Sequence, residues 1–393
     1  MLTQTQKDEV LALARALIAQ PSTSGHERGA ADAMAAFMRE AGFDSVMRDE
    51  YGSVIGCIRG SRPGPRILFD GHIDTVPVIP ENWTRDPYAG EVEDGKLYGR
   101  GASDMKGADA SFTAAGKFFL QSVGHRFAGE AYFAGVVHEE LFEGVASRSI
   151  SRIVRPDVVI IGEASRCNVK IGQRGRAEIV LETFGIPAHS ANPEKGVNAV
   201  YSMCRAVQAI NALPVAEQPG LGKAILELTD IMSTPYPGSS VVPAYCRATY
   251  DRRLLVGETK QSVLAPLQAC LDELHGKDPK FSAKVSLAGQ MLDCYTGSQI
   301  GGERFFPGWL YDPAEPFIRD VLAELHAVGQ EPEVTKYSFC TNGSHYAGEA
   351  GIRTLGYGPS REDLAHTNDE YIELSELWKS CEGYMAILRA LLK

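Results

Sequence analysis

The sequence predicts an α/β fold with a mostly parallel sheet flanked by helices, and two features of residues 1–165 carry this prediction. Apolar runs alternate along the chain with segments of helical periodicity. Some of these runs, such as residues 67–69, are continuous rather than alternating, which is typical of strands covered on both faces. Ligands of such sheets bind beyond the carboxyl ends of the strands. The polar residues that follow each apolar run are therefore the first candidates for a site.

The individual elements follow from these patterns in chain order. Val10, Leu13, Leu17 and Ile18 recur at helical spacing, which predicts an amphipathic first helix. The other elements expected in this region are a helix over 27–43, strands over 53–60 and 66–72, a helix over 106–122, and strands over 130–140 and 157–165.

The pattern changes near residue 175. The apolar residues of 176–185 and 246–256 alternate more evenly, helices are expected over 196–213 and 260–276, and a last strand over 281–289. This is an α+β pattern with one exposed sheet face. The earlier pattern then returns with a helix over 316–329, a strand over 352–358 and a helix over 375–392. The sequence thus predicts a discontinuous first domain, residues 1–176 and 290–393, with a second domain, residues 177–289, inserted into it.

Composition narrows the class of protein. With 39 basic and 50 acidic residues the net charge is −11, which does not favour nucleic-acid binding. No apolar run approaches the roughly 18 residues of a membrane span, and Lys7, Asp8 and Glu9 interrupt the N-terminal segment, unlike a signal peptide. The eight cysteines contain no CxxC pair. We therefore expect reduced thiols in a cytoplasmic protein that binds neither nucleic acid nor membrane.

The first candidate motif stands at the end of strand 66–72. In an extended segment residues two apart point the same way, so His72 and Asp74 lie together. One can bind a metal while the other orients the imidazole. A histidine in an ordinary strand-end turn explains the same motif, so alone it decides nothing.

Similar polar residues recur at the ends of other predicted strands and helices. Glu139 and Glu140 end strand 130–140, Glu163 ends strand 157–165, Asp104 precedes a helix, and His366 follows strand 352–358. Each has an ordinary alternative, such as a solvated pair of glutamates or an N-cap aspartate. Because parallel strands bring their carboxyl ends to one edge, these groups can also converge. Imidazoles and carboxylates without cysteine suit zinc, cobalt or manganese.

Charge balance favours two metal ions over one. If Asp104, Glu140 and Glu163 are ionised, two divalent cations and a bridging hydroxide make the cluster neutral. A single cation leaves uncompensated negative charge, which is costly where water is excluded.

Five motifs together resemble a known family: "GHIDTVP", "LYGRGASDMKGADA", "HEE", "IGEAS" and "AHTNDEYIEL". They are similar to the signatures of the co-catalytic metallohydrolases that include acetylornithine deacetylase, succinyl-diaminopimelate desuccinylase, aminoacylase and glutamate carboxypeptidase. The resemblance covers nearly the whole chain, in the family's order. It implies a zinc-exopeptidase-like catalytic domain with an inserted lid domain that commonly forms homodimers.

The resemblance also implies residue roles. Asp74 would orient a histidine ligand, Glu139 would be the general base, Asp104 would bridge the metals, and the peptide bond after Asp104 would be cis. The implied metal ligands are His72, Asp104, Glu140, Glu163 and His366.

Two segments of the inserted domain resemble functional parts of the family. In "FGIPAHSANPEKGVNAV", His189 would reach the partner subunit's active site and stabilise the oxyanion. An exposed turn histidine is the alternative. In "YDRRLL", Arg253 matches a carboxylate-binding arginine better than Arg252 does, although either could simply face solvent.

The sequence departs from the commonest family pattern at two positions. Ser240 stands where many relatives have asparagine, and Asn342, an expected substrate-binding residue, stands where many have aspartate. The Thr-Asn-Gly form resembles a less characterised branch, so both departures leave the substrate open.

The resulting functional prediction is a metal-dependent hydrolase that cleaves the amide bond of a small N-acyl amino acid, of deacetylase, desuccinylase or aminoacylase type. Its cofactors would be two divalent ions per subunit, zinc first, with cobalt or manganese as alternatives. A dipeptidase or carboxypeptidase with the same site is one rival, and a catalytically silent binding protein is another. The intact Glu139, Asp104 and His366 argue against the silent protein.

Overall fold

The computed structural model describes residues 1–393, and the chain divides into two compact units. Unit 1 comprises residues 1–173, 291–301 and 309–393, and unit 2 comprises residues 174–290 and 302–308. The boundaries expected from sequence, 177 and 289, lie close to the first two crossings of the chain. The excursion of residues 291–301 into unit 1 has no counterpart in that expectation.

Unit 1 is built on a nine-stranded sheet of order β1-β2-β6-β3-β7-β22-β8-β20, with β21 also paired to β8. The central strands β6, β3, β7 and β22 are parallel, and the pairs β1–β2, β2–β6 and β8–β20 are antiparallel. The predicted α/β class is confirmed, with a mixed rather than wholly parallel sheet. The strands are β1 (Ser45–Arg48), β2 (Val54–Arg59), β3 (Arg62–His72), β6 (Ala128–Val136), β7 (Val158–Ile161), β8 (Val169–Gln173), β20 (Trp309–Leu310), β21 (Val334–Tyr337) and β22 (Arg353–Gly356).

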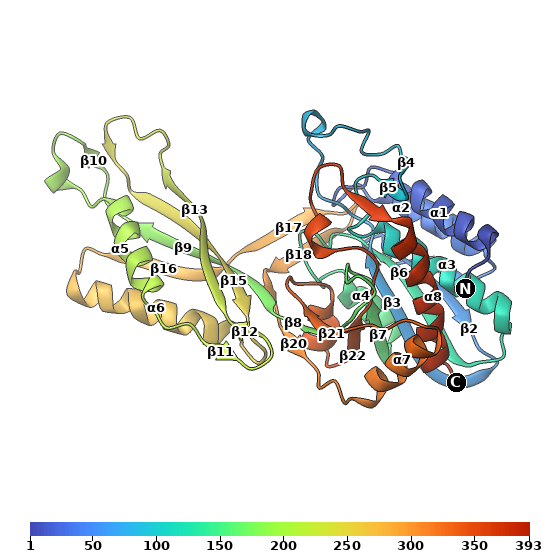
Figure 1. The fold of residues 1–393 in the computed structure, drawn as a ribbon. Coiled ribbons are helices and arrows are strands. Elements are labelled where there is room, and N and C mark those ends of the chain that lie inside the picture. Colours follow the sequence, from blue (N-terminus) through green and yellow to red (C-terminus); the bar gives the residue numbers. More distant parts are fainter. The chain divides into compact units, whose positions relative to one another are not determined.

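Six helices of unit 1 lie against its sheet (Figure 1), and their buried apolar residues form its core together with those of the strands. Phe69 of β3 stacks on Phe133 of β6 with ring centroids 5.1 Å apart, while Phe112 and Tyr384 from two helices contact Phe69. Such continuous apolar contact keeps residues 67–72 of β3 buried up to the end of the strand. The helices are α1 (Gln4–Ile18), α2 (Arg28–Glu40), α3 (Lys106–Val123), α4 (Ser147–Val154), α7 (Pro316–Ala327) and α8 (Leu374–Leu391).

Asp70 of β3 points to the opposite face from Phe69, because successive side chains of a strand alternate. There it accepts hydrogen bonds from the Tyr346 hydroxyl at 2.7 Å and from the Asn342 amide at 2.9 Å. Burial raises the pKa of Asp70 to about 6, although these hydrogen bonds oppose the rise. Tyr346 lies in a short π-helical segment, Ser344–Glu349.

Unit 1 also contains shorter elements outside its main sheet. A small sheet has the order β23-β5-β4, and two 3₁₀ turns cover Pro80–Asn82 and Glu362–Leu364. The peptide bond between Asp104 and Met105 is cis, as the resemblance implied. All eight cysteines are free, and none of the helices combines the length and apolarity that a membrane crossing requires. The small strands are β4 (Val92–Glu93), β5 (Lys96–Tyr98) and β23 (Tyr371–Glu373).

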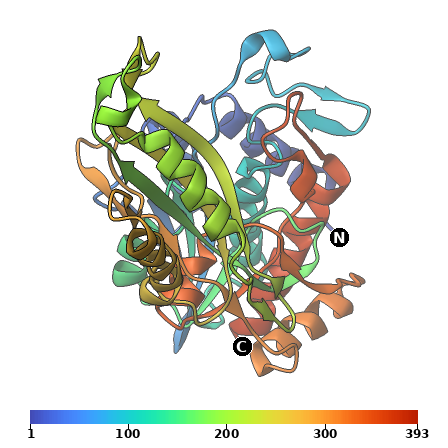
Figure 2. The ribbon, with the colours of Figure 1, turned by 90° about the vertical axis from the view of Figure 1, so that its left-hand side faces the viewer.

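Unit 2 is an antiparallel sheet of order β13-β15-β9-β16, with β19 also paired to β9. Two helices, α5 (Ala199–Asn211) and α6 (Lys260–Lys277), lie side by side over it (Figure 2). Ile179, Leu181 and Ala248 of the sheet pack with Met203 and Leu267 of the helices in an apolar core. The strands are β9 (Gly175–Phe184), β13 (Ile225–Thr234), β15 (Tyr245–Leu254), β16 (Ser282–Leu287) and β19 (Phe305–Phe306).

Three further strand pairs complete the structure. In unit 2, β10 (Ala188–His189) pairs with β14 (Val241–Val242), and β11 (Glu217–Gln218) pairs with β12 (Gly222–Lys223). A hairpin of β17 (Gly289–Asp293) and β18 (Gln299–Glu303) passes from unit 2 into unit 1 and back. In unit 1 the Tyr295 hydroxyl donates to the carbonyl of Gly52 at 2.6 Å, so the hairpin tip is anchored there.

Candidate active site

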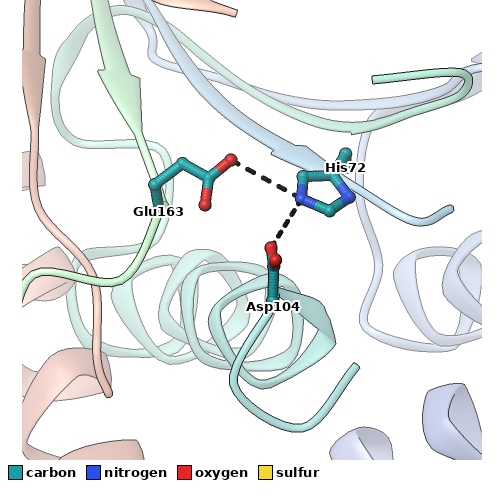
Figure 3. Close-up of side chains that lie close together, drawn as sticks. All are labelled: His72, Asp104 and Glu163. Atoms are coloured by element: carbon teal, nitrogen blue, oxygen red, sulfur yellow. Dashed lines mark hydrogen bonds and ion pairs between the residues drawn. The ribbon is translucent and has the colours of Figure 1, made fainter. Parts of the chain in front are cut away.

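The carboxyl end of β3 brings the first three predicted ligands together. Nε2 of His72 lies 2.9 Å from Oδ1 of Asp104 and 3.5 Å from Oε1 of Glu163 (Figure 3). His72 ends β3, Glu163 follows β7, and Asp104 precedes α3, so parallel neighbours and one loop supply the group. All three residues are at least nine-tenths buried.

A second group shares Asp104 with the first. Nε2 of His366 lies 3.2 Å from Oδ2 of Asp104 and 2.9 Å from Oε2 of Glu140. Asp104 therefore turns one oxygen toward each histidine, as a bridging carboxylate would. The donor atoms of each group lie within 4.8 Å of one another. More than half of the His366 side chain is exposed, so this group is open to solvent.

The electrostatics of both groups fit cations. Burial and the negative charge of Asp104 raise the pKa of Glu163 to about 8. Burial likewise raises the pKa of Glu140, with Asp104 adding to the rise. Hydrogen bonds to Asp104 and Glu140 raise the pKa of His366 to about 10. Carboxylates that crowd one another in a buried place are stabilised as anions by divalent ions, so this donor set suits two of them.

Hydrogen bonds fix which nitrogen of His72 faces the other ligands. Its Nδ1 donates to the backbone carbonyl of Asp74 at 2.9 Å, which leaves Nε2 for a metal. Burial alone would lower the pKa of His72, but the hydrogen bond to Asp104 and the charge of Glu139 outweigh it and raise the pKa well above its usual value.

The carboxylate of Asp74 lies 3.7 Å from Nδ1 of His72, and its hydrogen bonds are made mainly to the loop that contains Glu139 and Glu140. Its two oxygens accept the backbone N–H groups of Glu139 at 3.0 Å and Glu140 at 3.2 Å, and the Ser24 hydroxyl at 2.7 Å. Asp74 is completely buried, so it fixes the backbone of the Glu139–Glu140 pair firmly. The predicted role of its carboxylate toward the imidazole stays a prediction.

Glu139 lies beside the two groups without joining either. Its Oε2 is 4.0 Å from Nε2 of His72, while its buried Oε1 has no hydrogen-bond partner. Burial and the charges of Glu163 and Glu143 raise the pKa of Glu139 well above its usual value, against the opposing charge of His72. A buried carboxylate with a free oxygen next to two groups of possible metal ligands is suited to move a proton.

Asn342 is almost fully buried, and both ends of its amide have protein partners. Its nitrogen donates to Asp70, and its oxygen accepts the backbone N–H of Gly144 at 2.7 Å. These contacts tie β3 to the end of the loop that follows Glu139. A contact of this side chain with substrate stays a prediction.

The remaining predicted site residues lie in unit 2. His189 is exposed on β10, and its Nδ1 accepts the backbone N–H of Ala191 at 3.0 Å. Arg253, on β15, pairs with Asp251 at 2.8 Å. Arg252, weighed as its alternative, pairs instead with Glu258. Ser240 is exposed beside the β14 strand.

Sequence reasoning missed the residues that support the ligands. Glu370 accepts four hydrogen bonds from the loop that ends in Asp104, one of them from Arg100 at 2.6 Å. The only signal for it was its place in "HTNDEY", four residues after His366. Asp70 stands at the same strand end as His72, but its contacts with Asn342 and Tyr346 gave no signal, because these partners are far away in the sequence.

Residues 68–390 match the model of peptidase family M20/M25/M40. The chain belongs to this family. It is 33% identical over 380 residues to the uncharacterized protein YgeY of Escherichia coli strain K12, covering 95% of this chain and 92% of the relative. It is 32% identical over 298 residues to a succinyl-diaminopimelate desuccinylase of Methylobacterium radiotolerans, covering 70% of this chain and 74% of that protein.

A solved structure of the M20 family has the same fold. The YXEP protein of Bacillus subtilis, described as a dinuclear metal-binding peptidase, superposes with a TM-score of 0.72 at 13% identity and covers 98% of this chain and 99% of its own. Membership of the family confirms the predicted resemblance, and it makes this chain an enzyme that hydrolyses amide bonds.

Proposed function

We propose that this M20 enzyme uses two divalent ions to hydrolyse the amide bond of a small N-acyl amino acid. The observation that carries the proposal is Glu139, whose unpartnered Oε1 lies in a buried place beside the two ligand groups. A binding protein has no need for such a group, whereas a hydrolase needs one proton acceptor beside its attacking water.

The ions would be held by His72, Asp104 and Glu163 on one side and by Asp104, Glu140 and His366 on the other. When bound, divalent ions lower the pKa of water and polarise the scissile carbonyl. Glu139 takes the proton from the attacking water and passes it to the leaving nitrogen. Asp74 holds the backbone of Glu139 during both transfers. Zinc suits this set of imidazoles and carboxylates, with cobalt or manganese as alternatives.

The oxyanion donor in this proposal is His189, acting from a partner subunit. Because the backbone N–H of Ala191 can only donate, Nδ1 of His189 must accept, and the proton of the neutral ring is then on Nε2. An exposed ring with a proton on Nε2 is the form that donates a hydrogen bond to an oxyanion. Arg253 is proposed to bind the substrate carboxylate.

The partner is proposed to be a second copy of this chain, joined through unit 2. β13 is a ten-residue edge strand whose outer side has no partner in its sheet. Ile231, Met232 and Tyr236 on or next to it are exposed, as is Tyr201 on α5. A long, apolar edge strand is a surface that proteins normally cover by pairing.

A dipeptidase or carboxypeptidase is the second candidate. The desuccinylase relative favours an N-acyl amino acid, while the B. subtilis structure favours a peptide. Both reactions need the same base and the same ions, so only substrates can separate them.

The test compares wild type with Glu139→Gln and Glu140→Gln, two identical changes at adjacent residues. Free-amine release is measured from N-acetyl, N-succinyl and N-carbamoyl amino acids and from dipeptides, together with metal content. We expect Glu139→Gln to keep both ions and lose about 10²–10⁴-fold in turnover, and Glu140→Gln to lose one ion. Turnover by Glu139→Gln near the wild-type rate would exclude Glu139 as the base.

A further inference from the structure

Glu370 is completely buried and accepts four hydrogen bonds from a single loop. Its Oε1 accepts the backbone N–H groups of Ser103 at 2.7 Å and Asp104 at 2.9 Å. Its Oε2 accepts Nη1 of Arg100 at 2.6 Å and the N–H of Gly101 at 3.2 Å. Each oxygen is thus used twice, which is close to the capacity of a carboxylate.

The loop depends on this one side chain for its shape. The N–H groups of Gly101, Ser103 and Asp104 have no backbone acceptor, since residues 100–104 belong to no helix or strand. Buried N–H groups without a partner are costly, so the loop is held in place by Glu370. Arg100 neutralises the buried carboxylate, and its guanidinium lies over the Trp83 ring at 5.2 Å.

The two segments that this contact joins each contain one proposed ligand of the His366 group. The loop ends in Asp104, and the segment that contains Glu370 begins with His366. The Asp104–Glu370 hydrogen bond joins positions 266 residues apart. It therefore sets how far Asp104 lies from the segment that carries His366.

A neighbouring contact fixes the same segment from the other side. The carboxylate of Asp369 accepts both the backbone N–H and the hydroxyl of Thr84, at 2.9 and 2.8 Å. Both His366 and Asp369 have positive φ angles, +61° and +49°, so the segment is sharply curved. A curved segment that is held at Asp369 and Glu370 leaves His366 little freedom to drift.

We propose that Glu370, supported by Arg100, is a positioning residue that holds Asp104 and His366 at metal-binding separation. The inference rests on the proposed function, because it assumes that Asp104, Glu140 and His366 bind an ion. Glu370 contacts the shared Asp104 and lies only four residues from His366 in the chain. It has no such link to His72 or Glu163, so its loss affects the His366 group more.

The test is Glu370→Gln, in which an amide NH₂ meets two of the four donors and at least two hydrogen bonds are lost. Metal-free protein is titrated with Zn²⁺ against a chromophoric chelator, and the absorption spectrum of bound Co²⁺ reports the coordination. We expect one dissociation constant to rise about 10–100-fold, as supporting residues of metal sites generally show, and the other to change much less.

Asp49→Asn is the matched control. Asp49 is also buried and accepts three backbone N–H groups, from Tyr51, Gly52 and Ser53, but none of these residues adjoins a ligand. The amide oxygen of the variant can still accept all three N–H groups, because all of them point to Oδ1, and we expect the variant to bind both ions with wild-type affinity. If Glu370→Gln does not fold, Arg100→Lys keeps the charge and loses the Nη1 geometry, and a several-fold weakening of the same ion is expected.

Three results would overturn the inference. Unchanged dissociation constants in Glu370→Gln, or in Arg100→Lys if that variant replaces it, would do so while leaving the proposed function intact. If Glu370→Gln and Asp49→Asn raised both dissociation constants equally, Glu370 would have only a general stabilising role. A wild-type protein that binds no ion at the His366 group would overturn the proposed function as well, which is a distinct outcome.

Discussion

The two units of the chain differ in where they keep their ionisable side chains. Unit 1 buries several at the ends of its strands, among them Asp70, His72, Asp74 and Glu163, whereas the buried polar residues of unit 2 are only threonines and a serine. The core of unit 2 is apolar, and its charges form partly or fully exposed ion pairs. Buried charge must be paired or bind cations. The fold of unit 1 is thus arranged around its site, while unit 2 can contribute to chemistry only through exposed residues.

Removing one aspartate from each unit tests most directly whether metal binding depends on the buried charges of unit 1. Asp104→Ala is expected to lose both ions and reduce turnover to background, because this carboxylate alone faces both histidines. Asp251→Ala in unit 2 removes partly buried ion pairs with Arg176 and Arg253 and is expected to keep both ions, because neither pair includes a proposed metal ligand. Metal content should separate the variants. Two ions retained in Asp104→Ala would contradict the shared-ligand arrangement.

The next largest effect is expected from unit 2 itself. His189→Ala should lower turnover by about 10²-fold, the scale of one oxyanion donor, with metal content and melting temperature unchanged because the side chain is exposed. His326→Ala, an exposed histidine on α7 of unit 1, provides the control and should have no effect. Rates measured at saturating substrate give the turnover of both variants and of wild type. Equal turnover of His189→Ala and wild type would remove His189 from the reaction.

The apolar edge of unit 2 allows a test of partner formation. Ile231→Lys places a charge on the β13 edge and should convert dimers to monomers, since lysine on an edge strand prevents pairing. Ile153→Lys on α4 is a comparable change, because Ile153 is 43% exposed and Ile231 is 49% exposed. Light scattering during size-exclusion chromatography measures the mass. Dimeric Ile231→Lys would exclude this edge, and an active monomer would contradict action of His189 from a partner.

Much of unit 1 could be predicted from its sequence because its proposed ligands stand where local patterns end. His72 and Glu163 directly follow apolar runs, and the parallel order of β3 and β7 then brings them together. Local patterning says nothing of residues that act through distant contacts. Glu370 meets its loop across more than 260 positions, and the amide of Asn342 is occupied by Asp70 across 272.

In unit 2 the limit of prediction was different. The alternating strands and both helices follow from periodicity, but β13 gave no signal because most of its residues are exposed. An edge strand carries a clear pattern only when one of its faces is buried within the chain. The excursion of residues 291–301 also escaped prediction, since its anchors are contacts with residues far away in the sequence, such as those of Tyr295 with Gly52 and of Thr296 with Glu50.

The last difference expected between the two units is in how the free energy of unfolding depends on pH. Glu27 in unit 1 is completely buried, and its Oε1 accepts the N–H groups of Gly25 and His138. Burial, and then the charge of Asp74, raises the pKa of Glu27 from 4.5 to about 8. The folded protein therefore binds more protons than the unfolded chain between these values. Its free energy of unfolding from this group must fall as pH rises through that window.

Glu27→Gln should remove this dependence while keeping an oxygen for both N–H groups. A pKa difference of one corresponds to about 1.4 kcal/mol, so for a shift from 4.5 to about 8 we expect metal-free wild type to lose about 3–4 kcal/mol relative to the variant between pH 5 and about 8. Glu182→Gln in unit 2 should behave oppositely. Partial burial opposes the shift there, but the Tyr245 hydroxyl and Lys284 lower the pKa of Glu182, so its contribution is lost only as pH falls below about 4.5. Urea unfolding from about pH 3 to about pH 8 gives both differences, and parallel curves for wild type and Glu27→Gln would show that Glu27 keeps its charge in the folded core.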